Sequence, residues 1–142
     1  MKRILIVALT VVAIAMMAGV ALADVTLSHG NSSATINPST NMLDWYVDGV
    51  DQLFEQDWWI RIGTGSQARL GTLLTPTWTQ PAGNVVQATF TGSGITATAT
   101  YWLLGGLAGS NTADITEQLL VDTGGQAVTI YQYVDFDLGN TI

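Results

Sequence analysis

After Asp24, apolar and polar residues alternate with a period of two along most of the chain. The alternating segments are rich in Thr, Val, Ile, Trp and Tyr, and Gly, Asn, Pro and Ser separate them, which is the pattern of β-strands joined by turns. No segment of useful length shows a helical period. We predict about eight strands, over residues 24–28, 33–37, 43–47, 52–63, 84–91, 95–104, 114–122 and 126–138.

The alternation also assigns side chains to the two faces of each strand, because neighbouring residues on a strand point in opposite directions. In 52–63 the predicted core face carries Phe54, Trp58, Ile60 and Ile62, and the wetter face carries Leu53, Glu55, Asp57, Trp59 and Arg61. The other residues expected to face inward are Leu43, Trp45 and Val47; Val86, Ala88 and Phe90; Ile95, Ala97, Ala99 and Tyr101; and Val128, Ile130, Val134, Phe136 and Leu138.

Strands of this number and length, with turn signals between them, predict an all-β fold: an antiparallel β-sandwich, jelly-roll-like or immunoglobulin-like. Threonine ladders on one side of several strands fit a sheet with one solvated face. Pro38, Pro76 and Pro81 are expected in loops, because proline cannot donate a hydrogen bond to a neighbouring strand.

The first 23 residues have the three parts of an export signal. Lys2 and Arg3 precede an apolar run, and Ala21-Leu22-Ala23 forms the small-x-small site that a signal peptidase accepts. The alternative is an uncleaved membrane anchor, since roughly 20 apolar residues can span a bilayer. The cleavage site, and the lack of a basic flank after it, favour a signal peptide over 1–23 and a single domain over 24–142. Without cysteine, a lipid anchor on that residue is excluded.

Removing the signal leaves Arg61 and Arg69 as the basic residues against all 11 acidic residues, a net charge of −9. A chain this acidic cannot neutralise phosphates, which excludes nucleic acid as a partner and disfavours anionic membrane surfaces. We expect no membrane insertion after cleavage. The lack of cysteine also excludes disulfides and thiol chemistry.

Asp44, Asp48 and Asp51 surround a predicted turn at Asp48-Gly49, and Glu55 and Asp57 follow closely. Clustered carboxylates near a turn can bind calcium, which takes six to eight oxygen ligands. The spacing does not match an EF-hand loop. A solvated acidic strand edge is therefore the favoured interpretation, and a metal site is left undecided.

Asp135 and Asp137 project from one face of the last predicted strand, beside Tyr131 and Tyr133. Paired carboxylates can serve as acid and base in glycoside hydrolysis, and aromatic rings can stack on sugars. One strand supplies no cleft, however, so an outward polar face is the favoured interpretation. We predict no catalytic residues and no cofactor site.

Three further features carry little chemistry. His29 is the single histidine, and no Ser-His-Asp set with a known local signature accompanies it. The glycine-rich stretch 105–109 has no following Lys-Ser/Thr and so is not a phosphate loop. Asn31-Ser32-Ser33 matches the N-glycosylation sequon. The signal peptide is of bacterial type, however, so the match is weak evidence for glycosylation.

Five tryptophans are the notable excess in this chain. On an exported β-sandwich they could form a sugar-binding platform or simply pack in the core. The aliphatic neighbours of Trp45 and Trp58 favour the core, and Trp59 and Trp102 are the better candidates for exposure. A binding platform requires two or three aromatic side chains on one face, from the set Trp59, Trp78, Trp102, Tyr131 and Tyr133.

The stretch from Met42 to Gly63 contains W-Y-V-D-G-V-D-Q-L-F-E-Q-D-W-W-I-R-I-G. It resembles the W-x-V-D-G-V-x-Q-L-F-x-Q-x-[WF]-[WFY]-x-R-[IV]-G block of exported bacterial proteins of the PEP-CTERM group. The later Tyr131–Gly139 is similar to a second block of the same proteins. The resemblance implies a surface or extracellular-matrix protein that is sorted by a C-terminal Pro-Glu-Pro motif, hydrophobic helix and basic tail. It implies no catalytic residues.

None of those three sorting elements is in the sequence, which stops directly after a predicted strand, so we expect that the domain continues beyond Ile142. The function we expect is that of a non-enzymatic exported envelope or matrix protein, with extracellular polysaccharide or other surface proteins as partners. The alternatives are a carbohydrate-binding module or glycan-active enzyme fragment, and a calcium-stabilised adhesin.

Overall fold

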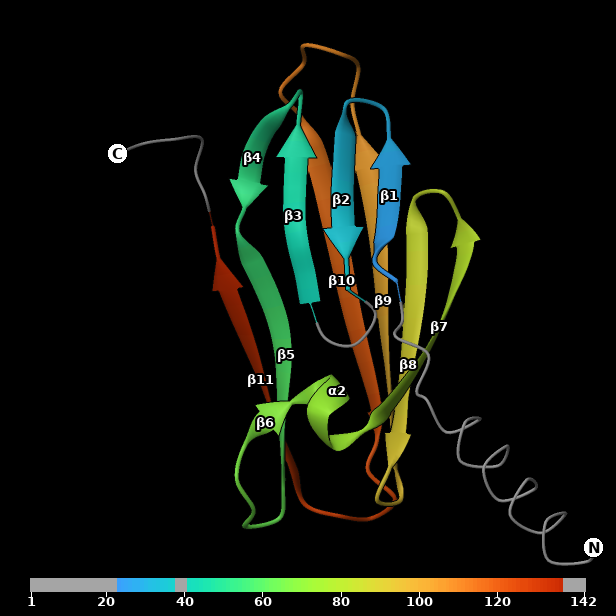
Figure 1. Cartoon of the computed structure of the whole chain (residues 1–142), viewed down its shortest axis with the longest axis vertical. Helices are drawn as coiled ribbons and strands as arrows, with labels where there is room; N and C mark the ends of the chain where they lie inside the picture. The colour runs from blue at the N-terminus through green and yellow to red at the C-terminus, as the bar shows by residue number, and fades with distance from the viewer. Residues whose placement is uncertain (1–22, 38–40, 137–142) are drawn as a thin grey trace, which may run out of the picture.

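The computed structural model describes residues 23–37 and 41–136. Antiparallel strands dominate this part of the chain, and one short helix interrupts them (Figure 1). The elements are β1 (Val25–His29), β2 (Ser32–Ile36), β3 (Asn41–Val47), β4 (Val50–Leu53), β5 (Glu55–Ile62), β6 (Ala68–Arg69), α2 (Leu70–Leu73), β7 (Thr75–Ala82), β8 (Val85–Gly92), β9 (Ile95–Gly105), β10 (Ala113–Asp122) and β11 (Val128–Asp135).

The strands form two sheets that stack face to face, so the predicted antiparallel β-sandwich is confirmed (Figure 1). Sheet A has the order β1-β2-β3-β5-β11, with β4 paired to β3 and β6 paired to β5. Sheet B has the order β10-β9-β8-β7. Neighbours in each sheet are mostly consecutive in sequence, so the order is that of two meanders rather than of a jelly roll or an immunoglobulin fold.

The core lies between the sheets, where β1 and β2 pack over β9. The inward residues predicted for the two central strands of sheet B are buried: Val86, Ala88, Phe90, Ile95, Ala97, Ala99 and Tyr101. From sheet A the core receives Val25, Leu27, Ala34, Ile36, Met42 and Ile60. Alternation thus assigned the faces of β8 and β9 correctly, because each strand buries one side and exposes the other. Of the sheet A residues named, Ile60 had been predicted to face inward, whereas Met42 is buried although alternation gave the inward face of this strand to Leu43, Trp45 and Val47.

Helix α2 closes one end of the sandwich. It has a single turn, and Leu70 and Leu74 point from it and its C-terminus into the core with 0% and 3% of their surface exposed. A four-residue helix is too short to show a period, which explains why the alternation pattern gave no sign of it. In the described residues, no helix is long and apolar enough to cross a membrane. Residues 1–22, which hold almost all of the predicted export signal, lie outside the described part.

The prediction of one continuous strand over 52–63 was wrong. The strand breaks at Phe54, between β4 and β5, and the side chains on either side of the break exchange faces. Leu53 is buried, with 1% of its surface exposed, whereas Phe54 is 64% exposed. Beyond the break the predicted inward residues Trp58 and Ile62 pack against the core as expected.

Two of the prolines were also misplaced. Pro76 and Pro81 lie in β7 rather than in loops. β7 is the last strand of sheet B and pairs with β8 on one side only, so a residue without an N–H group is tolerated on its open edge. Pro38 lies outside the described residues.

Candidate functional site

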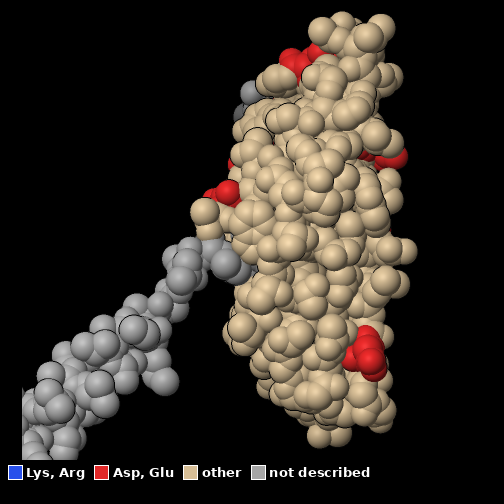
Figure 2. All heavy atoms as spheres, turned by 90° about the vertical axis from the view of Figure 1, so that its right-hand side faces the viewer, with Lys and Arg blue, Asp and Glu red and all other residues tan. Residues whose placement is uncertain are grey.

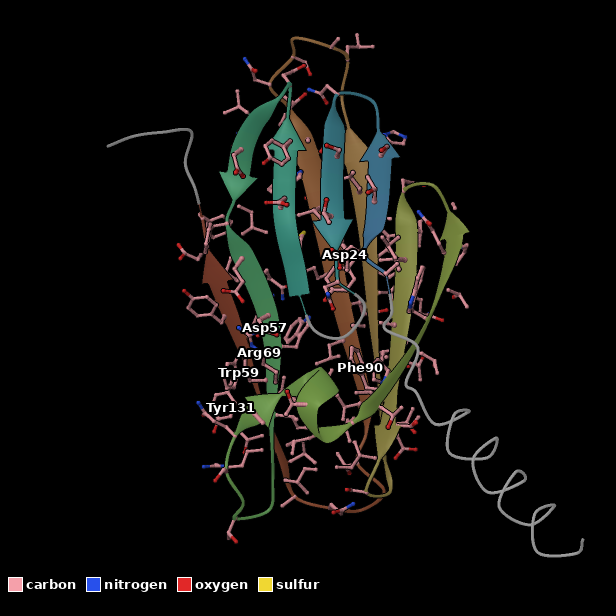
Figure 3. All side chains as sticks on the ribbon, viewed as in Figure 1. Asp24, Asp57, Trp59, Arg69, Phe90 and Tyr131 are labelled. Carbon is pink, nitrogen blue, oxygen red and sulfur yellow. The ribbon has the colours of Figure 1, made fainter. Side chains whose placement is uncertain are left out.

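The outer face of sheet A carries a row of three large side chains. Trp59 on β5 lies directly opposite Tyr131 on β11 and, on its other side, opposite Arg69 on β6. Partners in antiparallel register have Cβ atoms about 5 Å apart, so the three side chains are neighbours. The Arg69 guanidinium carbon lies 5.8 Å from the centre of the Trp59 ring, within the range of a cation–π contact. Figure 3 labels these residues on three adjacent strands.

A third aromatic side chain extends the row. Tyr133 is two residues beyond Tyr131 on β11, so it points from the same face, and 49% of its surface is exposed. Trp59, Tyr131 and Tyr133 line a shallow groove of about 360 Å³ together with Glu55, Gln67 and Arg69. We call the three aromatic side chains the aromatic platform. Three of the five aromatic residues considered for a sugar-binding platform thus lie on one face of sheet A.

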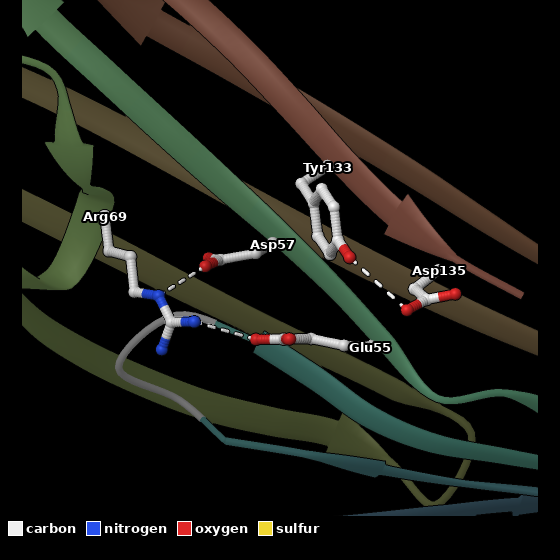
Figure 4. Close-up of polar contacts among 5 residues, drawn as sticks. All are labelled: Glu55, Asp57, Arg69, Tyr133 and Asp135. Atoms are coloured by element: carbon white, nitrogen blue, oxygen red, sulfur yellow. Dashed lines mark hydrogen bonds and ion pairs between the residues drawn. The ribbon is translucent and has the colours of Figure 1, made fainter.

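Arg69 holds two carboxylates beside this groove (Figure 4). Its Nε lies 2.8 Å from Oδ2 of Asp57, and its Nη2 lies 2.9 Å from Oε1 of Glu55. The side chain of Asp57 is 1% exposed and that of Glu55 is 23% exposed. The prediction that Asp57 is solvated was therefore wrong, because Arg69 and its neighbours cover it. A buried carboxylate that is paired in this way orders the arginine, which in turn supports the Trp59 ring.

Burial raises the pKa of Asp57 to about 6, although the positive charge of Arg69 opposes this effect. Glu55 and Asp57 are both ion-paired to the same guanidinium, so neither is poised as a free acid or base.

The structure describes one carboxylate of the pair considered on the last strand. Asp135 points outward from β11, pairs in register with Glu55 and accepts a hydrogen bond from the Tyr133 hydroxyl at 3.3 Å. The negative charge of Asp135 raises the pKa of Tyr133. Asp137 lies outside the described residues. The groove is therefore edged by acidic groups from two strands.

The other tryptophans do not contribute to the platform. Trp45, Trp58 and Trp78 pack against the core. Trp102 is half-buried on β9 at a position between the inward residues Tyr101 and Leu103, so it faces outward from sheet B, on the opposite side of the sandwich from Trp59. Trp59 and Trp102, the two candidates for exposure, both point away from the core but are only half exposed, and they lie on opposite sides of the sandwich, so they cannot share a surface.

The acidic cluster around the first turn has a structural role at Asp48. This carboxylate accepts hydrogen bonds from the backbone N–H groups of Gly109 and Asn111, at 2.6 and 2.9 Å, and from Nδ2 of Asn31 at 2.7 Å. These donors lower its pKa. Asp51 accepts a bond from the Leu53 N–H group at 3.2 Å. Among the described residues, no group of three His, Asp or Glu side chains could hold a metal ion.

His29 and the glycine-rich stretch 105–109 meet at the same end of the sandwich. Nδ1 of His29 accepts a hydrogen bond from the Gly105 N–H group at 3.0 Å, and Oδ1 of Asn31 accepts one from Gly106 at 2.7 Å. A Cβ atom on Gly105 would overlap the His29 carbonyl oxygen. The glycines therefore allow the β9–β10 loop to pack on the β1–β2 turn.

Arg69 and Gln67 are the groove residues that the sequence did not single out. Gln67 precedes β6, and Arg69 belongs to it. This strand pairs with β5, but its two residues are too few to show an alternating pattern. The one available signal was charge: Arg69 is one of only two basic residues after the export segment.

Comparisons with protein-family models, with curated proteins and with solved structures found no match to this chain.

Proposed function

We propose that this protein is a non-enzymatic exported protein of the bacterial envelope or matrix, and that it binds neutral polysaccharide through the aromatic platform. The observation that carries the proposal is the placement of Trp59, Tyr131 and Tyr133 on one face, in one groove. Flat aromatic rings with a polar tip offer apolar area to the C–H face of a pyranose ring and leave its hydroxyls accessible.

The polar side chains around the platform suit those hydroxyls. Glu55, Gln67 and Arg69 line the groove beside the rings. Their carboxylate, amide and guanidinium groups supply both acceptors and donors. A small number of fixed polar groups in a mostly apolar groove is the usual arrangement for ligand specificity.

The charge of the site favours a neutral glycan over an acidic one. Arg69 is already paired with Glu55 and Asp57, and Asp135 adds a further carboxylate. The surface in Figure 2, which is a different side of the sandwich, shows scattered acidic groups and no basic ones. A uronic-acid polymer would therefore be repelled both locally and at long range.

Affinity electrophoresis through gels that contain one polysaccharide each tests this proposal. We expect retardation in gels of at least one neutral glycan, and none in gels of a polyuronate. Equal mobility in every gel would contradict glycan binding. Export is tested separately: N-terminal sequencing of the protein recovered outside the cytoplasm should begin at Asp24, and a chain retained whole in the membrane would contradict cleavage.

The same proposal includes the PEP-CTERM-type resemblance of the stretch from Met42 to Gly63. Its support is the order of residues alone. The block contributes Trp59 to the platform, Arg61 to the same outer face, and Trp45 and Val47 to the inner face. Reading the coding region beyond Ile142 tests it: a Pro-Glu-Pro motif with a hydrophobic helix would support this sorting class, and its absence would refute it.

A further inference from the structure

A second groove lies between the two sheets, on the side where β10 ends sheet B and β11 ends sheet A. It has a volume of about 490 Å³, within the range of small-molecule sites. Its walls are apolar side chains from both sheets: Met42, Trp45, Leu53, Ile115, Val134 and Phe136. Val134 and Phe136 remain 37% and 59% exposed. The Trp45 ring is fixed, because its Nε1 donates a hydrogen bond to Ser32 at 2.9 Å.

The same groove contains a carboxylate that bridges the sheets. Glu117 lies on the inward side of β10, between Ile115 and Leu119. It accepts a hydrogen bond from Nε2 of Gln132 on β11 at 3.0 Å, and both residues line the groove. Asp114 adds a second carboxylate at the rim.

A buried amide without a partner lies beside this groove. Gln56 is 1% exposed, and neither its Nε2 nor its Oε1 makes a hydrogen bond among the described residues. In register it lies between Met42 on β3 and Val134 on β11, which both line the groove. A buried amide with no partner costs about 1–3 kcal/mol.

The groove has acidic groups but no cationic partner for them. Arg61 and Arg69 both belong to the outer face of sheet A, and the sequence has no lysine after Lys2. Burial raises the pKa of Glu117 to about 7, the response of a carboxylate that has no compensating charge. A cation on an apolar body would complement both the charge and the walls.

We propose that this groove binds a small amine carried on an apolar chain or ring. The apolar part lies against Trp45, Ile115 and Val134, and the ammonium group binds the Glu117 carboxylate. This site is on the inner side of sheet A, whereas the aromatic platform is on its outer side, and Gln132 lines both grooves.

Isothermal titration of the 24–142 protein at pH 7 with n-octylamine, n-octanol and n-octanoate tests the proposal. We expect n-octylamine to bind at least tenfold more tightly than n-octanol, and n-octanoate to show no binding. Glu117→Gln should reduce the affinity for n-octylamine at least tenfold and leave the affinity for n-octanol unchanged. Asp122→Asn, which removes an exposed carboxylate on the outward side of the same strand, should change neither.

Equal affinity for the amine and the alcohol, an unchanged n-octylamine affinity in Glu117→Gln, or no binding of n-octylamine would each overturn the proposal. Circular dichroism of each variant checks that it is folded. Trp59→Ala serves as a control for the other site: it should leave n-octylamine binding intact, because that ring lies on the opposite face of the sheet.

Discussion

Trp59 and Tyr131 lie directly opposite each other in the register of β5 and β11, and both point to the outer face of sheet A. The two strands come from opposite halves of the domain and meet only because β11 adds to the edge of the first meander. Aromatic pairs across strands stabilise a sheet by about 0.5–1.5 kcal/mol beyond the area that they bury. Here both side chains are half-buried, so part of each remains accessible to solvent.

The ion pair between Arg69 and Asp57 should be important for stability. We expect Arg69→Met to lower the free energy of unfolding by about 2 kcal/mol at pH 7, because it leaves a buried carboxylate uncompensated while the arginine itself is partly exposed. The loss should shrink at pH 5, where Asp57 is protonated. The matched control is Arg61→Met, since Arg61 is exposed and donates a hydrogen bond to Thr129; a change below about 0.5 kcal/mol is expected there. Urea unfolding measures both, and equal losses in the two variants would refute the role of the pair.

Stability should fall as the pH rises from about 4 to 7. The pKa of Asp57 rises from 3.8 to about 6 and that of Glu117 from 4.5 to about 7, both mainly through burial. Within this window the folded protein keeps protons that the unfolded chain releases, so ionisation favours unfolding. At full strength the two raised pKa values correspond to about 6 kcal/mol. Solvent screening at the half-exposed Glu117 lowers this figure, and we expect a decrease of at least about 2 kcal/mol across the window.

Chemical denaturation at closely spaced pH values follows this effect. Glu117→Gln should reduce the slope of the curve most near pH 7, because it removes the group with the higher pKa and leaves Asp57, whose pKa is about 6. A wild-type stability that instead increases over this range would show that the two carboxylates are not buried as described.

The close packing of the β9–β10 loop on the β1–β2 turn predicts a strong effect at Gly105. A Cβ atom there would overlap the carbonyl oxygen of His29, which belongs to rigid backbone. We expect Gly105→Ala to cost about 2 kcal/mol or more in urea unfolding. Gly83→Ala is the matched control, because a Cβ atom at Gly83 meets nothing within 4 Å. A tolerated Gly105→Ala would mean that the loop can move away from the turn at little cost.

Calcium should leave the melting temperature unchanged. Each oxygen of Asp48 already accepts at least one hydrogen bond, so the carboxylate at the centre of the acidic turn is committed to loop contacts. A ligand present at about 100 times its Kd would add about 2.7 kcal/mol of stability and would be obvious in a melting curve. Differential scanning calorimetry with millimolar calcium and then with chelator checks this. A rise that the chelator reverses would favour the adhesin alternative.

Most strands could be predicted because alternation is a local property of the sequence, but β6 and β7 were not. The failures occur where local patterns end. At Phe54 a single residue between β4 and β5 reverses the faces, which places Leu53 rather than Phe54 in the core. β7 contains two prolines, and only its position at the edge of sheet B makes them acceptable.

The sequence predicted individual residues of the candidate site but not their arrangement. The outward faces of Trp59, Tyr131 and Tyr133 follow from alternation, but their meeting depends on the pairing of β5 with β11, which no local pattern encodes. Arg69 was missed for a similar reason, because it reaches Asp57 only after β6 folds back on β5. The sequence therefore predicted which aromatic residues face outward, but not which strands pair to bring them together.

The most direct test of the aromatic platform is the affinity of Trp59→Ala and Trp102→Ala for the neutral glycan that retards the wild-type protein most. Both residues are half-buried tryptophans on outward strand faces, but they lie on opposite sides of the sandwich. Truncating a central aromatic contact costs about 2 kcal/mol, or roughly thirtyfold in affinity. We expect that loss in Trp59→Ala and an unchanged affinity in Trp102→Ala, measured by titration calorimetry on folded protein. Equal affinities in the two variants, or a loss only in Trp102→Ala, would contradict glycan binding at the platform.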